Sequence, residues 1–149
     1  MQKHVYDAFI EAPGHKGKGM IELFHGYTYS GHPLAMAAGL ATLDVYKEQG
    51  LYERAASLEG YWQEALHSLK GHPHVVDIRN CGLMGAVELA PRPGKPGQRA
   101  FQVFTTAFQQ GVLVRVTGDT IALSPPLIID KAQIDQIVTT LSQAINEVA

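Results

Sequence analysis

The sequence predicts an α/β fold, with a short mixed or antiparallel sheet of about four strands and helices packed on one face. Two observations support this prediction. Four short runs rich in β-branched residues lie in the second half of the chain, and segments with apolar residues at helical spacing precede, separate and follow them. The length of 149 residues, with 46% apolar and 17% charged residues, suits a domain with its own hydrophobic core.

The N-terminal third is expected to combine loop and helix. Val5–Ile10 can form a short helix or strand, and Ala12–Gly19 has the glycines and proline of a loop. Pro33 is tolerated in the first turn of a helix, so a helix is expected from Leu34 to about Lys47. Because this segment is apolar around most of its circumference, we expect the helix to be buried.

A second, amphipathic helix should begin after Gly50 and end before Gly71, because apolar residues recur at helical spacing between them. The recurring positions are Leu51, Ala55, Leu58, Trp62, Ala65 or Leu66, and Leu69. Four short β-rich runs, each bounded by Gly or Pro, predict the strands, at Val75–Arg79, Leu83–Leu89, Val112–Val116 and Thr120–Leu123.

Two further helices complete the pattern. Pro91–Gly97 is a predicted loop, and Ala100–Gln110 is a predicted helix with three phenylalanines on one face, Phe101, Phe104 and Phe108. The last helix should begin after Asp130, which can form a capping box with Gln133. Its expected buried stripe is Ile134, Ile137, Val138, Leu141, Ile145 and Val148.

Composition and charge exclude several classes of function. A net charge of −2 with scattered Lys and Arg gives no basic stripe, so nucleic acid is not an expected partner. No apolar run approaches the roughly 20 residues that span a bilayer, so no membrane is expected and the cytoplasm is the expected location. Cys81 is the single cysteine, expected to be a small buried residue, and the histidines show no spacing suited to a metal.

The stretch His25–Pro33 is the first candidate site, because it combines glycines, hydroxyls and a helix start. A phosphate could accept hydrogen bonds from the Thr28 hydroxyl and from exposed backbone N–H groups, and the N-terminus of the following helix would attract it. The same composition also fits a turn that only caps that helix. The residues by themselves leave both interpretations open.

Arg115 is the second candidate. Strand alternation places it on the same face as Leu113, opposite a face formed by Val112, Val114 and Val116 that is expected to point to the core. A guanidinium presents a planar fork of donors that matches a carboxylate. An ordinary surface arginine would show the same pattern, and the residues leave that alternative open as well.

The first candidate stretch resembles the HGxTYSGHPxAxAA signature of class III pyridoxal-phosphate-dependent aminotransferases. The matching residues are His25, Gly26, Thr28, Tyr29, Ser30, Gly31, His32, Pro33, Leu34, Ala35, Ala37 and Ala38. The resemblance continues through Arg79–Leu89 and Gly111–Leu127 and covers essentially the whole chain. It is strongest to the ω-amino acid (β-alanine):pyruvate transaminases.

This resemblance implies that residues 34–149 form a linking helix and the C-terminal small α/β domain of a fold-type I enzyme. Residues 1–33 would be the tail of the large cofactor-binding domain, mostly loop, with the phosphate-contacting turn. Thr28 would bind the phosphate of pyridoxal 5'-phosphate in the partner subunit's active site, which implies a homodimer. Arg115 would bind the substrate carboxylate. Ala122 occupies the position where ornithine and acetylornithine aminotransferases carry their carboxylate-binding arginine.

Transamination needs a lysine that holds the cofactor as a Schiff base, and none of the lysines here lies in the sequence context that the family uses. We therefore expect no catalytic residue in this chain. The chain would be the C-terminal portion of a transaminase that moves an amino group from an ω-amino acid or amine to pyruvate, and it would be inactive alone. Two alternatives stay open: a non-catalytic α/β dimerisation or binding module, and a fragment of another class III enzyme such as an aminomutase.

Overall fold

The computed structural model describes residues 2–10 and 26–148. Contacts within the chain divide it into two units, an N-terminal unit of Met1–Leu43 and a C-terminal unit of Asp44–Ala149. The predicted loop at Ala12–Gly19 and the signature residue His25 lie outside the described residues. Within the described residues no helix is long and apolar enough to cross a membrane.

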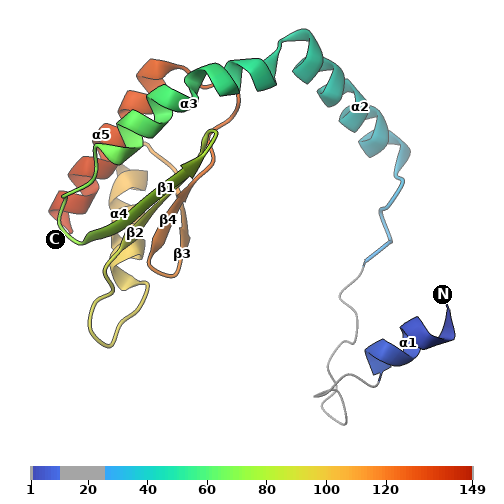
Figure 1. Ribbon diagram of the computed structural model, residues 1–149, viewed down its shortest axis with the longest axis horizontal. Helices are drawn as coiled ribbons and strands as arrows, with labels where there is room; N and C mark the ends of the chain where they lie inside the picture. The colour runs from blue at the N-terminus through green and yellow to red at the C-terminus, as the bar shows by residue number, and fades with distance from the viewer. Residues whose placement is uncertain (1, 11–25, 149) are drawn as a thin grey trace. The chain divides into compact units, whose positions relative to one another are not determined.

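The N-terminal unit contains helix α1, Lys3–Ile10, and most of helix α2, Pro33–Glu48 (Figure 1). The first segment is therefore a helix, where the sequence allowed a helix or a strand. An ion pair across one helical turn joins Lys3 Nζ to Asp7 Oδ2 at 2.7 Å. Helix α2 begins at Pro33, as the fixed backbone angle of proline predicts, and ends one residue later than expected.

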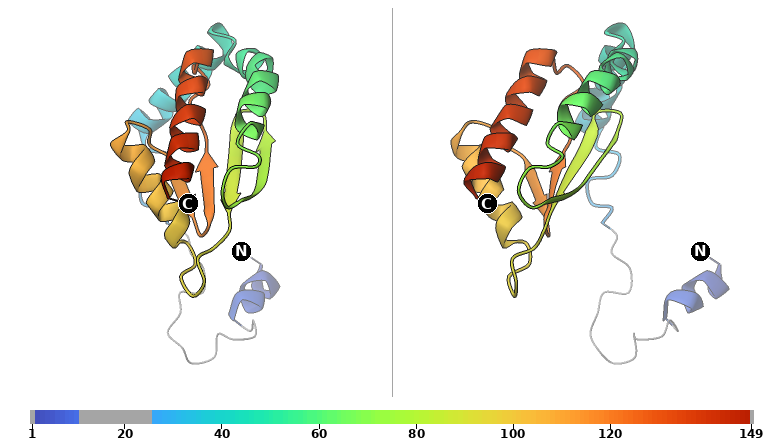
Figure 2. Two further views of the ribbon diagram at one scale, coloured as in Figure 1. Left: turned by 90° about the vertical axis from the view of Figure 1, so that its left-hand side faces the viewer. Right: turned by 60° about the vertical axis from the view of Figure 1, so that its left-hand side comes forward.

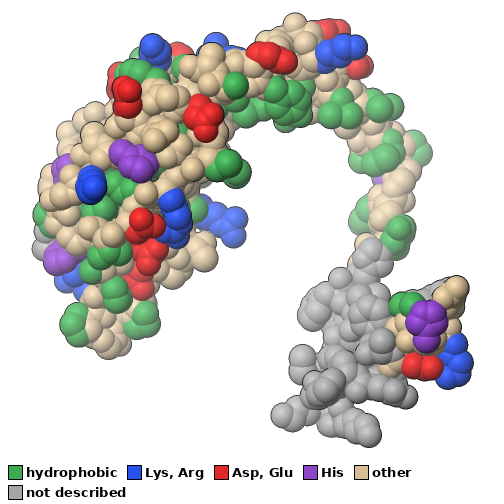
Figure 3. Space-filling model, in the orientation of Figure 1, with side chains coloured by type: hydrophobic (Ala, Val, Ile, Leu, Met, Phe, Trp, Pro, Cys, Tyr) green, Lys and Arg blue, Asp and Glu red, His purple; other side chains and the backbone are tan. Residues whose placement is uncertain are grey.

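The prediction that α2 is buried is wrong for this chain. None of its residues is buried, and its apolar side chains are open to solvent, with Leu34 74% and Leu40 65% exposed. Figure 3 shows hydrophobic side chains at the surface along this helix. The described part of the N-terminal unit holds no sheet or second long helix against which these side chains could pack. The prediction that α2 is apolar around most of its circumference is correct, but such a helix is buried only where another part of the protein packs against it.

The C-terminal unit is a four-stranded antiparallel sheet with three helices on one face. Its elements are α3 (Leu51–His67), β1 (Val75–Cys81), β2 (Met84–Leu89), α4 (Gln98–Gln109), β3 (Arg115–Thr117), β4 (Thr120–Leu123) and α5 (Lys131–Glu147). The strand order is β1-β2-β4-β3, and α5 lies between α3 and α4 (Figure 2). This architecture confirms the predicted fold class and selects the antiparallel form of the sheet.

Strand β3 is shorter than predicted. The expected strand covered Val112–Val116, whereas pairing with β4 begins only at Arg115. Beyond the end of β4 the chain continues into Ser124 and two prolines, and proline has no N–H to donate to a ladder. Residues 112–114 therefore precede β3 without pairing to β4. Their side chains still alternate as predicted.

The core lies between the sheet and the three helices. Its largest fully buried side chains are Trp62, Leu66, Leu69, Leu89, Ile121, Ile134, Leu141, Val87 and Val103. Gly85 in β2 lets α3 pack closely, because a Cβ at that position would lie 2.6 Å from Leu66 Cδ2 and 3.1 Å from Trp62 Cζ2. The predicted apolar stripe of α3 is confirmed, since Leu51, Leu58, Trp62, Leu66 and Leu69 are all buried.

The phenylalanines of α4 share one face, as predicted, and of the three only Phe104 is partly buried against the core. The buried residues of α4 include Ala100, Val103 and Ala107, which are small enough to let the helix approach the sheet. The rings of Phe101 and Phe108 are exposed and lie on either side of Phe104, at centroid distances of 5.7 and 6.3 Å. Two of the three phenylalanine rings of this helix are therefore available at the surface.

Helix α5 begins as the sequence predicts. The Asp130 carboxylate accepts a hydrogen bond from the Gln133 backbone N–H at 2.8 Å, and the Gln133 side chain accepts one from the Asp130 N–H at 3.1 Å. This reciprocal pair satisfies two donors at the helix start. The buried face of α5 includes Ile134, Val138, Leu141, Ala144 and Ile145, which pack between α3 and α4.

Candidate functional site

The sheet face opposite the helices carries the candidate carboxylate site. The strand register aligns Arg79, Ala86, Ala122 and Arg115 in one row across β1, β2, β4 and β3. Because paired residues project from the same face, the two arginines stand at opposite ends of the row with two small side chains between them. Cys81 follows Arg79 by two residues and is exposed, so the expectation that it is buried is wrong.

Arg79, at one end of the row, is already neutralised. Its Nη1 donates to Glu88 Oε2 at 2.8 Å and also to the carboxylate of Asp77. These hydrogen bonds, first that to Glu88 and then that to Asp77, raise the pKa of Arg79 above its usual value. A guanidinium with two carboxylate partners is a structural group here and is not available to a ligand.

Arg115, at the other end, is exposed and has no such partner. No hydrogen bond or ion pair within the described residues involves its guanidinium. The predicted alternation around it is confirmed, because Val112 and Val114 are buried while Leu113 is 74% exposed. The five donors of Arg115 are therefore free to bind an anion that approaches the open face of the sheet.

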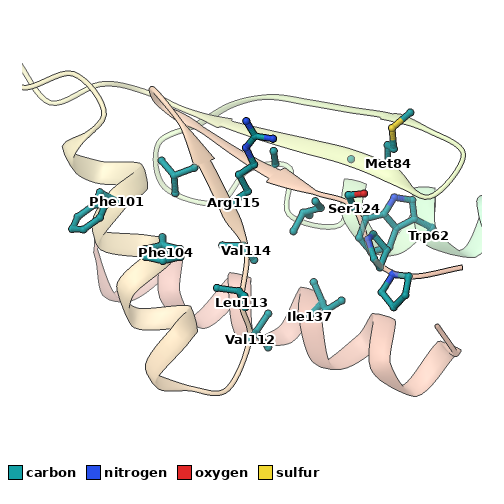
Figure 4. Close-up of a pocket in the computed structure, with 16 residues that line it drawn as sticks. Trp62, Met84, Phe101, Phe104, Val112, Leu113, Val114, Arg115, Ser124 and Ile137 are labelled. Atoms are coloured by element: carbon teal, nitrogen blue, oxygen red, sulfur yellow. The ribbon is translucent and has the colours of Figure 1, made fainter. Parts of the chain in front are cut away.

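Arg115 lies on the wall of an open pocket of about 1050 Å³ in the C-terminal unit (Figure 4). Apart from Arg115, the residues around the pocket are apolar or uncharged, and they are Trp62, Met84, Gly85, Phe101, Phe104, Val112, Leu113, Val114, Val116, Ala122, Leu123, Ser124, Pro125, Pro126 and Ile137. The sequence did not indicate that α3, α4 and the segment before β3 would meet here. The one sequence feature that pointed to an apolar surface near Arg115 was Leu113, which is two residues away and was predicted to lie on the same face.

Trp62 contributes an unusual polar group to this pocket wall. Its side chain is fully buried, and its indole Nε1–H has no hydrogen-bond partner within the described residues. A buried donor without an acceptor costs free energy, so it is rare in folded proteins. Nothing in the sequence distinguished Trp62 from an ordinary core tryptophan.

Ala122 lies directly opposite Arg115 in the β3–β4 register. An arginine at position 122 would therefore project from the same sheet face, on the neighbouring strand. Positions 115 and 122 therefore present their side chains next to each other on one face of the sheet.

Thr28, in the N-terminal unit, lies in a turn five residues before α2. The Ser30 N–H donates to the Tyr27 carbonyl at 3.1 Å, the His32 N–H donates to the Tyr29 carbonyl at 3.2 Å, and Gly31 has a φ of 74°. The hydroxyls of Thr28 and Ser30 are exposed and make no hydrogen bond within the described residues. The turn therefore does not use these hydroxyls to cap α2.

This turn fits the phosphate of pyridoxal 5'-phosphate as one part of a larger binding site. The Thr28 hydroxyl is a free donor, and a Cβ added at Gly26 or Gly31 would meet no atom within 4 Å, so an anion can approach the backbone closely. Thr28 belongs to the N-terminal unit and Arg115 to the C-terminal unit. Within the described residues, no group of three or more His, Cys, Asp or Glu side chains is arranged to hold a metal ion.

Comparison with known proteins shows which family this sequence resembles. Residues 2–145 match the family model described as aminotransferase class-III. The chain is 57% identical to an omega-aminotransferase of Caulobacter vibrioides over 97% of its length, and 40% identical to a beta-alanine–pyruvate aminotransferase of Pseudomonas aeruginosa over 97%. It covers 32% of each relative.

Solved structures show the same fold. A thermostable omega transaminase, a six-fold mutant from Pseudomonas jessenii, superimposes with a TM-score of 0.77 at 34% identity, over 85% of this chain and 30% of that one. The Pseudomonas jessenii omega transaminase in complex with PMP gives a TM-score of 0.74 at 35% identity, over 85% of this chain and 29% of that one. The architecture is thus that of a transaminase segment.

The chain belongs to the class III aminotransferases, a pyridoxal-phosphate-dependent family. Among its relatives are omega-aminotransferases and beta-alanine–pyruvate aminotransferases, and the chain spans about a third of their length.

Proposed function

We propose that this chain is the C-terminal portion of a transaminase that moves an amino group from an ω-amino acid or amine to pyruvate. The unpaired Arg115 guanidinium on the open sheet face is the observation that carries the proposal. Pyruvate and ω-amino acids both carry a carboxylate, which a free arginine recognises. The name of the Pseudomonas aeruginosa relative, beta-alanine–pyruvate aminotransferase, supports the same substrates, and that of the Caulobacter vibrioides relative, omega-aminotransferase, supports the same type of reaction.

In this proposal the two candidate residues have separate tasks. Arg115 binds the carboxylate of the amino donor or acceptor and so orients the molecule that reacts. Thr28 donates its hydroxyl to the phosphate of pyridoxal 5'-phosphate across the interface of a cytoplasmic homodimer. When bound, the cofactor supplies the electron sink for transferring the amino group. Neither residue takes or gives the proton of the reaction.

We also propose that the 149 residues cannot transaminate by themselves. The lysines of the chain are Lys3, Lys16, Lys18, Lys47, Lys70, Lys95 and Lys131. No lysine lines the pocket beside Arg115. Lys3 is engaged by Asp7, and Lys131 lies over the Tyr61 ring at 4.7 Å. Holding the cofactor as a Schiff base is therefore assigned to the part of the relatives that this chain does not span.

The role of Arg115 is tested in a chimera in which residues 2–145 replace the matching segment of the Caulobacter vibrioides relative. Arg115→Met should raise KM for pyruvate roughly 10- to 100-fold, because a hydrogen bond to a charged group contributes about 1.5–3 kcal/mol. The KM for a neutral aldehyde acceptor should not change. Lys70→Met, at an exposed position outside the pocket, removes one positive charge as the control. Unchanged pyruvate kinetics in the Arg115 variant would remove its assigned role.

The inactivity of the isolated chain is tested by adding pyridoxal phosphate and reducing with borohydride. We expect only scattered surface labelling, detected by mass spectrometry, and no turnover of an amino donor. The contrary result is a stable adduct on one specific lysine together with turnover, and it would show that the chain holds its own catalytic centre.

A non-catalytic binding module is the second candidate function, and one observation favours it. The C-terminal unit has its own hydrophobic core, closed by three helices, so it can fold without contributing to a catalytic centre. The chimera separates the two candidates. An active chimera whose pyruvate KM depends on Arg115 supports the transaminase, whereas an inactive but folded chimera supports the module.

A further inference from the structure

We propose that the N-terminal end of α4 holds a buried site for one small, weakly hydrated monovalent anion such as chloride. The site lies where the loop that joins β2 to α4 meets the turn between β3 and β4, at one end of the sheet (Figure 1). Its central residue is Arg99, in the first turn of α4. Arg99 is not among the residues that line the pocket beside Arg115, so the inference does not depend on the proposed transamination.

Arg99 is a buried charge without a carboxylate partner. It is 7% exposed, and no ion pair within the described residues involves it. Its Nε donates to the Ala90 carbonyl at 2.9 Å, but the buried Nη1 has no hydrogen-bond partner in the described part of the chain. A lysine at this position could release its proton, whereas an arginine stays charged at every working pH. The buried guanidinium therefore needs a further acceptor.

Two more positive groups lie close to Arg99. Burial, and next the charge of Arg92, lower the pKa of Arg99 below its usual value. The N-terminus of α4 adds a partial positive charge, and its first turn contains no acidic residue. Asp119 opposes these groups, but its Oδ1 already accepts a hydrogen bond from the Gly97 N–H at 2.7 Å. The start of α4 therefore carries an excess of positive charge.

The backbone at this end of α4 offers donors as well. Gly97 occupies the position before the helix, with a φ of 77°, and has no side chain that could accept from the N–H groups of the first turn. Side chains of a helix lean toward its N-terminus, and the bond to Ala90, one residue beyond β2, holds the Arg99 guanidinium on that side. An anion beside Nη1 would thus meet the guanidinium and the positive end of α4 together.

The tight surroundings determine the class of anion. Leu89 and Ala100, the chain neighbours of Ala90 and Arg99, are at most 1% exposed, and Nη1 itself is closed to solvent. Multiply charged, strongly hydrated ions such as phosphate and sulfate would lose too much hydration in such a place. A monovalent, weakly hydrated anion such as chloride or bromide loses less. Residues 93–96 of the neighbouring loop are exposed, and local opening of this loop admits the ion.

The test measures chloride binding to the full 149-residue chain by the line width of the chloride NMR signal, which broadens when chloride exchanges with a protein site. We expect excess broadening that added bromide reduces by competition. Thermal unfolding provides a second measurement, with gluconate, which is too large to enter, as the reference salt. At a chloride concentration about tenfold above its Kd, the midpoint of unfolding should be roughly 3–6 °C higher than in gluconate of equal ionic strength.

Three variants assign the effect to this site, and far-UV circular dichroism reports whether each is folded. Arg99→Met should abolish both the excess broadening and the difference between the two salts. Arg92→Met leaves Arg99 in place and should weaken chloride binding severalfold, so it tests the inference even where the loss of Arg99 unfolds the chain. Lys70→Met, at an exposed position, removes the same charge elsewhere and should change neither measurement.

Three results would overturn the inference. The first is equal unfolding midpoints in chloride and gluconate with no excess broadening, which means that water alone satisfies Nη1. The second is excess broadening that a folded Arg99→Met chain retains and Arg115→Met removes, which places the chloride on the open sheet face. The third is an unfolded Arg99→Met chain together with unchanged chloride binding in Arg92→Met.

Discussion

At the scale of single residues, the structure separates groups that look alike in the sequence. Arg79 and Arg115 both project from the open face of the sheet, in the same cross-strand row. Arg79 has two carboxylate partners and Arg115 has none within the described residues. Only a free guanidinium can bind a substrate carboxylate without first breaking an existing ion pair. The availability of Arg115 therefore follows from its surroundings and not from its residue type.

Gly85 is a residue whose importance is steric. Gly85→Ala should lower the free energy of unfolding by about 1–3 kcal/mol, because the added methyl group would lie 2.6 Å from Leu66 Cδ2 and 3.1 Å from Trp62 Cζ2 in a closely packed core. Urea denaturation followed by Trp62 emission measures the change. Gly60→Ala is the matched control: this glycine lies inside α3 with open space around it. The control should be neutral or stabilising by up to about 1 kcal/mol. Equal effects at both glycines would contradict the proposed close packing.

At the scale of elements, local sequence determined where helices begin, and long-range packing determined which of their faces are buried. The start of α2 at Pro33 and the capping box of α5 need only neighbouring residues. The buried face of α4 depends on how near the helix comes to the sheet, and the small side chains of Ala100 and Ala107 allow that approach. Periodicity placed the phenylalanines of α4 on one face but could not say which face meets the sheet.

The capping box of α5 gives a prediction at this scale. Asp130→Ala should lower the free energy of unfolding by about 0.5–2 kcal/mol, because the Gln133 N–H loses its acceptor at the helix start. Asp130→Asn keeps an oxygen acceptor at the same place and should restore most of the stability. Urea denaturation of the three proteins measures both effects. A loss of similar size in both variants would indicate that the charge of Asp130, and not its capping bond, stabilises the helix.

At the scale of the whole molecule, the chain consists of a C-terminal unit with its own core and an N-terminal unit whose longer helix, α2, has no buried residue. The resemblance to class III aminotransferases predicted a domain boundary at residues 33–34, and this boundary stays a prediction. The contacts of the chain divide it at residues 43–44, within α2. The exposed apolar surface of α2 means that residues 34–43 contribute little to the stability of the C-terminal unit.

The division of the chain is tested by comparing fragments 34–149 and 44–149 with the full chain. All three should unfold in one cooperative transition, with free energies of unfolding that agree within about 1 kcal/mol, because the buried core described for this chain contains only residues from position 51 onwards. Fragment 59–149, which lacks Leu51 and Leu58 of α3, should be much less stable. A large loss already on removing residues 34–43 would place the boundary nearer to residue 34. Urea denaturation provides the measurement.

The sequence alone determined the fold class, the helices, the location of most strands and the two candidate residues Thr28 and Arg115, because periodicity, capping and a long signature are local properties of the chain. Tertiary structure alone decided that β3 begins at Arg115, that α2 is exposed and that Cys81 lies on the open face. It also brought Phe101, Leu113 and Trp62 into one pocket with Arg115. Burial, pairing and pocket formation depend on residues far apart in the chain, and no local pattern records which of them meet.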